Sequence, residues 1–242
     1  MDAIKRHWDI RSSDYNDFVV KGFSDERELR AWQNHFTSIL GSEPLDILDV
    51  GCGPGIVSMQ LADLGHRVTS VDLSDRMLEH ASRNAVEHGY DIEFLQADAM
   101  DLPFEDASFD AVVSDYMLWT VPDPRKVISE WYRVLKSGCR LAYTDGDWFT
   151  DPRMTPMRCH LSSLFLRIDK GRPKENQECE EASMDLWSSS ASRPADDVRM
   201  LDDAGFRDIQ VIHNVQRKVL HGVRYMAYGY TNNHFTVTAV KP

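Results

Sequence analysis

The sequence predicts an α/β fold built on a doubly wound, mostly parallel, seven-stranded sheet, and three observations predict it. Apolar segments of strand length alternate with amphipathic segments of helix length between residues 45 and 147. Glycines end several of the helical segments, and two further strand-like segments follow near the C-terminus. Because strands that alternate with helices pair in parallel, each helix returns the chain across one face of the sheet.

The individual elements follow from cap residues and from the spacing of apolar residues. Ser24 or Asp25 begins a helix that continues through Gly41 and carries one apolar stripe. Core strands are expected at 45–50, 66–72, 91–96, 108–114 and 139–146. The helices between them are expected at 55–64, 75–88 and 124–136. Pro194 begins a later helix that ends at Gly205, and the last strands are expected at 207–213 and 234–240.

We divide the chain into four parts, at residues 1–44, 45–147, 148–192 and 193–242. The third part breaks the alternation, since apolar residues are followed there by an acidic, polar run. We interpret it as a helical lid inserted into the domain, and the alternative is a surface excursion that extends the core. The first part holds an N-terminal lid and a preface helix. Trp8 and Tyr15 are candidates to close a site, unless Trp8 only packs on the helix and Tyr15 is solvated.

Composition excludes several classes of protein. The net charge of −12 argues against a nucleic-acid partner, which requires a basic surface. The four cysteines form no C-x-x-C pair, so neither a disulfide framework nor a metal site is expected. The charged N-terminus leads into no apolar run, and no segment reaches the roughly 18 apolar residues of a membrane span. We therefore expect a cytoplasmic protein. Its hydrophobic content of 42% is sufficient for the core of one large domain.

A glycine-rich turn follows the first core strand and indicates the ligand. Gly51, Gly53 and Gly55 are spaced G-x-G-x-G, and Asp49 lies just before them. Small residues between a parallel strand and a helix let a nucleotide-like ligand approach the backbone closely. Asp49 would repel a pyrophosphate. The expected ligand is therefore an adenine nucleoside with a cationic tail, which describes S-adenosylmethionine.

Two further carboxylates stand at the ends of the next strands. Asp72 ends the second strand about 20 residues after the turn, where a ribose diol is usually bound. Asp98 follows the third strand and is expected beside the adenine amino group. With Asp49, this places one acid at each of three neighbouring strand ends.

These motifs resemble the class I S-adenosylmethionine-dependent methyltransferases, especially the small-molecule branch that includes the quinone-biosynthesis enzymes. The resemblance covers Leu45 to Asp147, and the motif at 130–138 is among its most specific parts. There Ser137-Gly138-Cys139 replaces the usual glycine pair. It implies a Rossmann-like sheet with a reversed seventh strand. It also implies the following cofactor-binding residues: Asp49, Gly51, Cys52, Gly53, Gly55, Asp72, Leu73, Met77, Asp98, Ala99, Met100 and Ser114.

The segment after the fourth strand is expected to border the methyl acceptor, because ligands bind outside the carboxyl ends of the strands. It lacks the Asn/Asp-Pro-Pro-aromatic signature by which some methyltransferases hold an amide or exocyclic amine. Tyr116, Trp119 and Trp148 are the candidate substrate-binding residues, and they suggest an apolar or cationic small molecule. The alternative for Asp115 is that it only caps the following turn.

In-line methyl transfer depends mainly on alignment and exclusion of water, and a base is needed only for an acceptor that carries a proton. Tyr15, Tyr116 and His160 are the catalytic candidates, with His221 as a further possible base. The residue pattern alone does not choose among them. It leaves open the acceptor, its reacting atom and the oligomeric state.

Three functions from different classes are compatible with this pattern. The leading one is methyl transfer from S-adenosylmethionine, with S-adenosylhomocysteine as product, to a small molecule. The second is a nicotinamide-dependent dehydrogenase on the same type of sheet, which Asp49 and the glycine spacing oppose. The third is a non-catalytic sensor or scaffold that binds S-adenosylmethionine.

Overall fold

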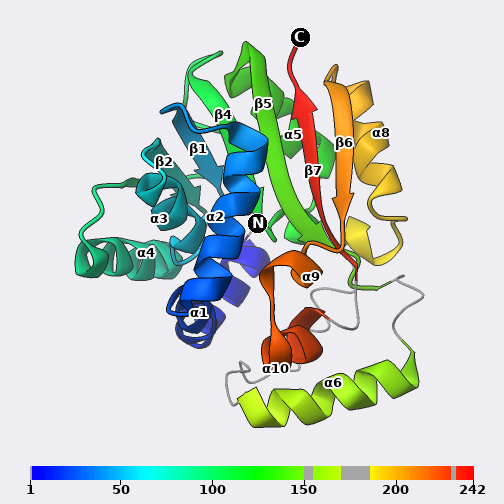
Figure 1. The fold of residues 1–242 in the computed structure, drawn as a ribbon. Helices are drawn as coiled ribbons and strands as arrows, with labels where there is room; N and C mark the ends of the chain where they lie inside the picture. Colours follow the sequence, from blue (N-terminus) through cyan, green and yellow to red (C-terminus); the bar gives the residue numbers. More distant parts are fainter. Residues whose placement is uncertain (1, 150–154, 170–185, 230–232) are drawn as a thin grey trace.

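A seven-stranded sheet runs through the centre of the molecule, in the order β3-β2-β1-β4-β5-β7-β6 (Figure 1). This computed structural model describes residues 2–149, 155–169, 186–229 and 233–242. All neighbouring strands are parallel except β7, which is antiparallel to both of its neighbours. The strands are β1 (Asp46–Val50), β2 (Arg67–Asp72), β3 (Glu93–Gln96), β4 (Phe109–Asp115), β5 (Leu135–Gly146), β6 (Arg207–His213) and β7 (His234–Val240).

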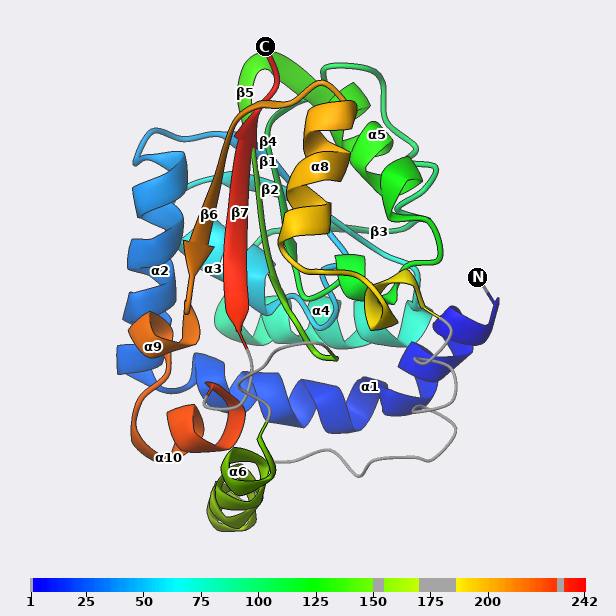
Figure 2. The same ribbon diagram turned by 90° about the vertical axis from the view of Figure 1, so that its right-hand side faces the viewer.

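Helices cover both faces of the sheet, and Figure 2 shows α2 and α3 on one face and α5 and α8 on the other. Their bounds are α2 (Glu26–Leu40), α3 (Ile56–Asp63), α4 (Asp75–His88), α5 (Pro124–Val134) and α8 (Ala195–Asp203). Leu48, Val112 and Trp131 lie in a buried core shared with α5 and α8, and Ile47 lies in a smaller core with Phe36 of α2. The doubly wound sheet and its reversed seventh strand are confirmed.

Local caps explain why these helices begin where the sequence predicts. The side chain of Asp25 accepts hydrogen bonds from the backbone nitrogens of Arg27 and Glu28, and Gly41 ends the same helix. Ser74 caps α4 by accepting from the Met77 nitrogen at 3.1 Å. Such caps satisfy backbone groups that the first helical turn leaves without partners.

The N-terminal segment differs from the prediction, because the first helix begins well before Asp25. Helix α1 (Asp2–Phe23) crosses beneath the carboxyl ends of the strands and packs on α4 (Figure 2). Its sequence is rich in charged residues and its apolar stripe is weak, so the helical period is hard to see. Tertiary contacts supply the stabilisation that local propensity does not show.

Three further helices cover the same end of the sheet. Helix α6 (Pro156–Asp169) lies within the expected lid, and residues 150–154 and 170–185 of that lid are outside the described part of the chain. Helices α9 (Gln216–Val219) and α10 (Gly222–Arg224), with the π-helical turn η3 (Tyr225–Gly229), separate β6 from β7 and were not predicted. In the described residues, no helix is both long and apolar enough to cross a membrane.

Candidate active site

The glycine turn after β1 lies at the centre of the site. The backbone nitrogens of Gly51 and Cys52 both donate to the Val71 carbonyl oxygen, at 2.8 and 3.0 Å. Gly51 has a φ of 73°, and a Cβ atom there would collide with the side chain of Met117. The backbone is therefore bent tightly against the β4 side of the site, which only glycine permits.

Asp49, at the end of β1, is a buried carboxylate, and one of its two oxygens is hydrogen-bonded within the described structure. Its Oδ2 accepts a hydrogen bond from the Ser58 hydroxyl at 2.6 Å, and Ser70 in turn donates to Ser58 at 3.0 Å. Its Oδ1 is shielded from solvent and has no partner among the described residues. Burial raises the pKa of Asp49 to about 7, and the nearby charge of Asp72 adds to this shift. A cationic ligand would relieve the cost of this buried charge.

Asp72, at the end of β2, is held by backbone groups on both oxygens. The Gly53 nitrogen donates to Oδ2 and the Ser74 nitrogen donates to Oδ1, each at 2.8 Å. Burial raises the pKa of Asp72 to about 6, against these hydrogen bonds. Each carboxylate oxygen can accept a second hydrogen bond, so Asp72 can still accept from a ribose diol.

The remaining cofactor candidates divide into two groups. Asp98 accepts from the Met100 nitrogen at 2.8 Å, and it lines the cavity together with Ala99, Cys52, Leu73 and Met77. Three candidates do not line it. Gly55 caps α3, Met100 packs against the core, and the Ser114 hydroxyl donates to the Val50 carbonyl oxygen at 2.7 Å. These three support the turn and the strands from outside the cavity.

A cavity of about 610 Å³ extends from these acids to an aromatic wall, which is formed by Tyr116, Trp119 and Trp148. Its volume falls within the roughly 300–1,000 Å³ of small-molecule sites. Helix α1 covers it, and two contacts hold α1 to the start of α4. Lys5 pairs with Asp75 at 2.8 Å, and the Ser74 hydroxyl donates to Asp9 at 2.5 Å. The ring of Tyr15, on this helix, would lie 3.7 Å from a Cβ atom added at Gly53.

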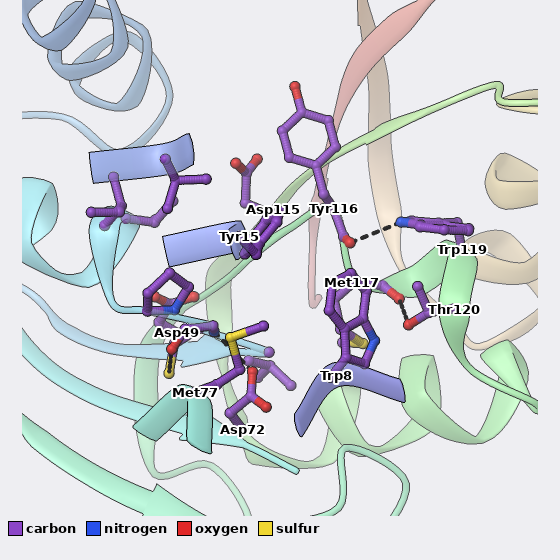
Figure 3. A pocket seen from close by; sticks show the side chains of 18 of the residues that line it. Trp8, Tyr15, Asp49, Asp72, Met77, Asp115, Tyr116, Met117, Trp119 and Thr120 are labelled. Carbon is purple, nitrogen blue, oxygen red and sulfur yellow. Dashed lines mark hydrogen bonds between the residues drawn. The ribbon is translucent and has the colours of Figure 1, made fainter. Parts of the chain in front are cut away.

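The aromatic wall is organised around Tyr116, which follows β4 with a φ of 54° (Figure 3). Its hydroxyl accepts a hydrogen bond from Gln216 at 2.9 Å and shares one with His234 Nδ1 at 3.0 Å. Its ring lies 5.9 Å from the ring of Trp148, measured between centroids. Burial and the nearby Asp115 charge raise the pKa of Tyr116, so its phenol remains protonated at neutral pH.

Trp119 extends this wall and is fixed from two sides. Its indole nitrogen donates to the Tyr116 carbonyl oxygen, and its backbone nitrogen donates to Asp145, both at 3.0 Å. The Ser188 hydroxyl donates to the Trp119 carbonyl oxygen at 2.7 Å. Asp145 also pairs with Arg193 at 3.0 Å in the protein interior. The end of the lid part and the start of the C-terminal part therefore hold the acceptor side of the cavity.

The structure separates the four candidate bases. Tyr15 and Tyr116 line the cavity, whereas His160 on α6 and His221 before α10 are exposed and do not line it. Burial, with the charges of Asp115 and Asp72, raises the pKa of Tyr15. Neither tyrosine is therefore readily ionised, and neither histidine is placed to reach an acceptor in the cavity.

The cavity residues that were not among the predicted site residues include Arg11, Asp115 and Gln216. Arg11 is three residues after Trp8 and four before Tyr15, a spacing that places all three on one helix face once α1 is known. Asp115 ends β4, where ligands of open α/β sheets bind. No sequence pattern indicated Gln216 as a site residue, because it contacts Tyr116 from 100 positions further along the chain.

The fold and the acids at the strand ends define a nucleoside-binding α/β protein, and comparison with known proteins identifies its class. Residues 48–143 match the family model described as a methyltransferase domain. A demethylmenaquinone methyltransferase of Renibacterium salmoninarum is 30% identical over 185 residues, which cover 75% of each chain. A ubiquinone biosynthesis O-methyltransferase of Pseudomonas entomophila is 34% identical over 145 residues, 59% of each chain. The chain belongs to the S-adenosylmethionine-dependent methyltransferase family, and it resembles the quinone-biosynthesis enzymes within it.

Solved structures show the same fold at lower sequence identity. The phosphoethanolamine N-methyltransferase 2 of Haemonchus contortus, solved with S-adenosylmethionine, superimposes with a TM-score of 0.65. It is 19% identical, and the match covers 99% of this chain and 60% of that one. The [4+2]-cyclase SpnF superimposes with a TM-score of 0.64 at 20% identity, over 99% of this chain and 96% of that one. The fold therefore carries more than one reaction, and the acceptor must be argued from the site.

The cofactor of this family is S-adenosylmethionine, and the residues present fit it. The solvent-shielded Asp49 oxygen without a partner suits a cationic group, and the positive-φ glycines leave the backbone open beside it. Asp72 retains acceptor capacity for a diol.

Proposed function

We propose that this methyltransferase acts on a small-molecule acceptor by in-line transfer inside the cavity beneath α1. The observation that carries the proposal is the continuity of that cavity, which joins Asp72 and Asp98 to the wall of Tyr116, Trp119 and Trp148. Helix α1 covers both regions. The net charge of −12 further opposes a nucleic-acid acceptor.

The cofactor's position follows from the residues that would hold it. Asp72 would accept from the ribose, and Asp98 would lie beside the adenine. Asp49 would face the cationic tail. Arg11 lines the cavity from α1 and would meet the only carboxylate of the cofactor, because arginine recognises carboxylates in a fixed geometry. When bound, S-adenosylmethionine supplies an electrophilic methyl group on sulfur.

The protein's own contribution is alignment and exclusion of water. Trp119 and Tyr116 are held by several hydrogen bonds and do not need to reorganise when an acceptor binds. The contacts Lys5–Asp75 and Ser74–Asp9 hold α1 over the site and keep this wall of the cavity in place. Orienting the two reactants in this way accounts for much of the rate acceleration of such reactions.

Isothermal calorimetry with S-adenosylhomocysteine tests the cofactor site without knowledge of the acceptor. We expect micromolar or tighter binding, and a parallel NADH titration should give no change in NADH fluorescence. Release of S-adenosylhomocysteine from S-adenosylmethionine in the presence of small acceptors, followed by mass spectrometry, tests the transfer itself. Binding without release across oxygen, nitrogen, sulfur and carbon acceptors would favour a sensor or scaffold.

A further inference from the structure

We propose that the acceptor is an amine, which Asp115 holds as its ammonium ion between Tyr15 and Tyr116. This inference rests on the proposed function and names the substrate class of the same site. The relevant residues are shown together in Figure 3, where the Asp115 carboxyl group lies beside the Tyr116 ring and points away from Asp49 and Asp72.

No described cation pairs with the carboxyl group of Asp115. Its Oδ1 is shielded from solvent and makes no hydrogen bond to any described residue. Burial raises the pKa of Asp115 well above its ordinary range, and the charges of Asp49 and Asp145 add to the shift. A hydrogen bond from Thr144 offsets only part of it. A buried carboxylate that lines a cavity without a cationic partner is matched by a cation from a ligand.

The hydrogen-bonding groups of the cavity show the same preference. Four cavity-lining oxygens are solvent-shielded and have no partner among the described residues, in Asp49, Gln60, Asp115 and Gln216. Cavity-lining donors without a hydrogen bond to a described residue include Arg11 Nε and Trp148 Nε1, and Arg11 is the residue proposed above to meet the cofactor carboxylate. An ammonium group offers up to three N–H donors and no acceptor, whereas a hydroxyl offers one donor. The Oδ1 atom of Asp115 is therefore an acceptor that an ammonium group can satisfy and that a quinone oxygen cannot.

The walls beside Asp115 are aromatic, which also favours a cation. Tyr116 is fixed by Gln216 and His234, and the Asp115 charge acts on both Tyr116 and Tyr15. The faces of tyrosine rings attract ammonium groups. In Figure 3 the Tyr15 side chain lies between the Asp115 carboxyl group and the side chains of Asp49 and Asp72. An amine at Asp115 would therefore lie next to the cofactor and not at the far end of the cavity.

The chemistry balances without a further reactant. Asp115 accepts one proton from the ammonium ion, which restores the nitrogen lone pair. That lone pair forms the new N–C bond as the C–S bond breaks, and the sulfur keeps the bonding electrons. The proton leaves Asp115 for water when the product departs. A carboxylate whose proton affinity is raised by its surroundings is a better acceptor for this step than an exposed one.

A matched pair of probes tests the inference by binding alone. We would titrate 2-phenylethylamine and its isostere 2-phenylethanol into the S-adenosylhomocysteine-loaded protein by isothermal calorimetry. The variants are Asp115→Asn, which keeps the shape and removes the charge, and Asp91→Asn, which removes an exposed charge away from the cavity. Thermal unfolding shows that each variant is folded, and Asp115→Ser replaces the asparagine variant if the latter does not fold.

The parent is expected to bind the amine at least tenfold more tightly than the alcohol. Asp115→Asn should abolish this preference and keep its affinity for S-adenosylhomocysteine within threefold, while Asp91→Asn behaves as the parent. The inference is overturned if the parent shows no preference for the amine, or if the preference survives in Asp115→Asn. It is also overturned if folded Asp115→Asn loses S-adenosylhomocysteine binding, since Asp115 would then serve the cofactor. A parent that does not bind S-adenosylhomocysteine contradicts the proposed function instead.

Discussion

The carboxylate of Asp72 accepts a hydrogen bond of 2.8 Å from the backbone nitrogen of Gly53, so the end of β2 is tied directly to the glycine turn after β1. The same carboxylate is the expected ribose ligand. Asp72→Ala should therefore weaken S-adenosylhomocysteine binding by roughly ten- to hundredfold, because a hydrogen bond to a charged group contributes about 1.5–3 kcal/mol. Isothermal calorimetry measures this directly.

Asp91→Ala is the matched control for that experiment, since it removes an exposed carboxylate that does not line the cavity. It should bind S-adenosylhomocysteine as the parent does. If folded Asp72→Ala also bound with parental affinity, the ribose would not lie at Asp72.

The buried carboxylate of Asp49 predicts a pH-dependent stability for the cofactor-free protein. Its folded pKa of about 7 lies above the ordinary value of 3.8 for an aspartate, so the folded state keeps a proton that the unfolded state has lost. The stability that this proton provides is complete below about pH 4 and is lost as the pH rises towards 7. At 1.36 kcal/mol per pKa unit, the total loss is at most about 4 kcal/mol.

Asp49→Asn removes this titration. The free energy of unfolding of the variant minus that of the parent, measured in urea, should therefore be larger at pH 8 than at pH 4.5. An equal difference between the two proteins at both pH values would show that Asp49 does not carry a raised pKa. Saturating S-adenosylhomocysteine should reduce the advantage of asparagine, since a bound cation stabilises the charged carboxylate.

Gly51→Ala should lower the free energy of unfolding more than Gly89→Ala does, although both substitutions cause the same backbone strain. Gly51 and Gly89 have φ values of 73° and 78°, so alanine costs about 1–2 kcal/mol of backbone strain at either position. At Gly51 the added Cβ also collides with Met117, whereas nothing lies within 4 Å at Gly89. Overpacking of this kind adds about 1–3 kcal/mol. Urea unfolding of the two variants compares them, and equal losses of stability would contradict the close approach of Met117 to the turn.

The buried ion pairs of Arg193, which does not line the cavity, predict a large loss of stability when this residue is replaced. Arg193 pairs with Asp145 at 3.0 Å and Asp197 at 2.5 Å, and these side chains are almost inaccessible to solvent. Arg193→Met leaves two buried carboxylates without their cation, which should cost about 3–5 kcal/mol of unfolding free energy. Because Asp145 also holds the Trp119 backbone, tryptophan fluorescence should change in the folded variant.

The exposed pair of Arg207 and Asp202, also 3.0 Å apart, provides the control. Arg207→Met should cost less than about 1 kcal/mol, since exposed ion pairs contribute little. Similar costs for both variants in urea would mean that Arg193 is not the counter-ion that the structure shows.

The central strands and helices were predictable because their signals are local. Asp25 and Gly41 mark both ends of α2, and Ser74 and Gly89 mark both ends of α4, within the helices' own sequences. Helix α1 was not predicted, because its many charged residues leave only a weak apolar stripe on the side that packs against the protein. It is stabilised by contacts with α4, more than 50 residues away, which no local pattern reveals.

The site divides in the same way. The sequence by itself determined the glycine turn and the acids Asp49, Asp72 and Asp98, because each lies at the end of its own strand and parallel strands bring those ends to one edge of the sheet. Only the tertiary structure decided the acceptor wall. Tyr116 meets Gln216 and His234 from 100 and 118 positions along the chain, and such contacts exist only after the whole sheet has assembled.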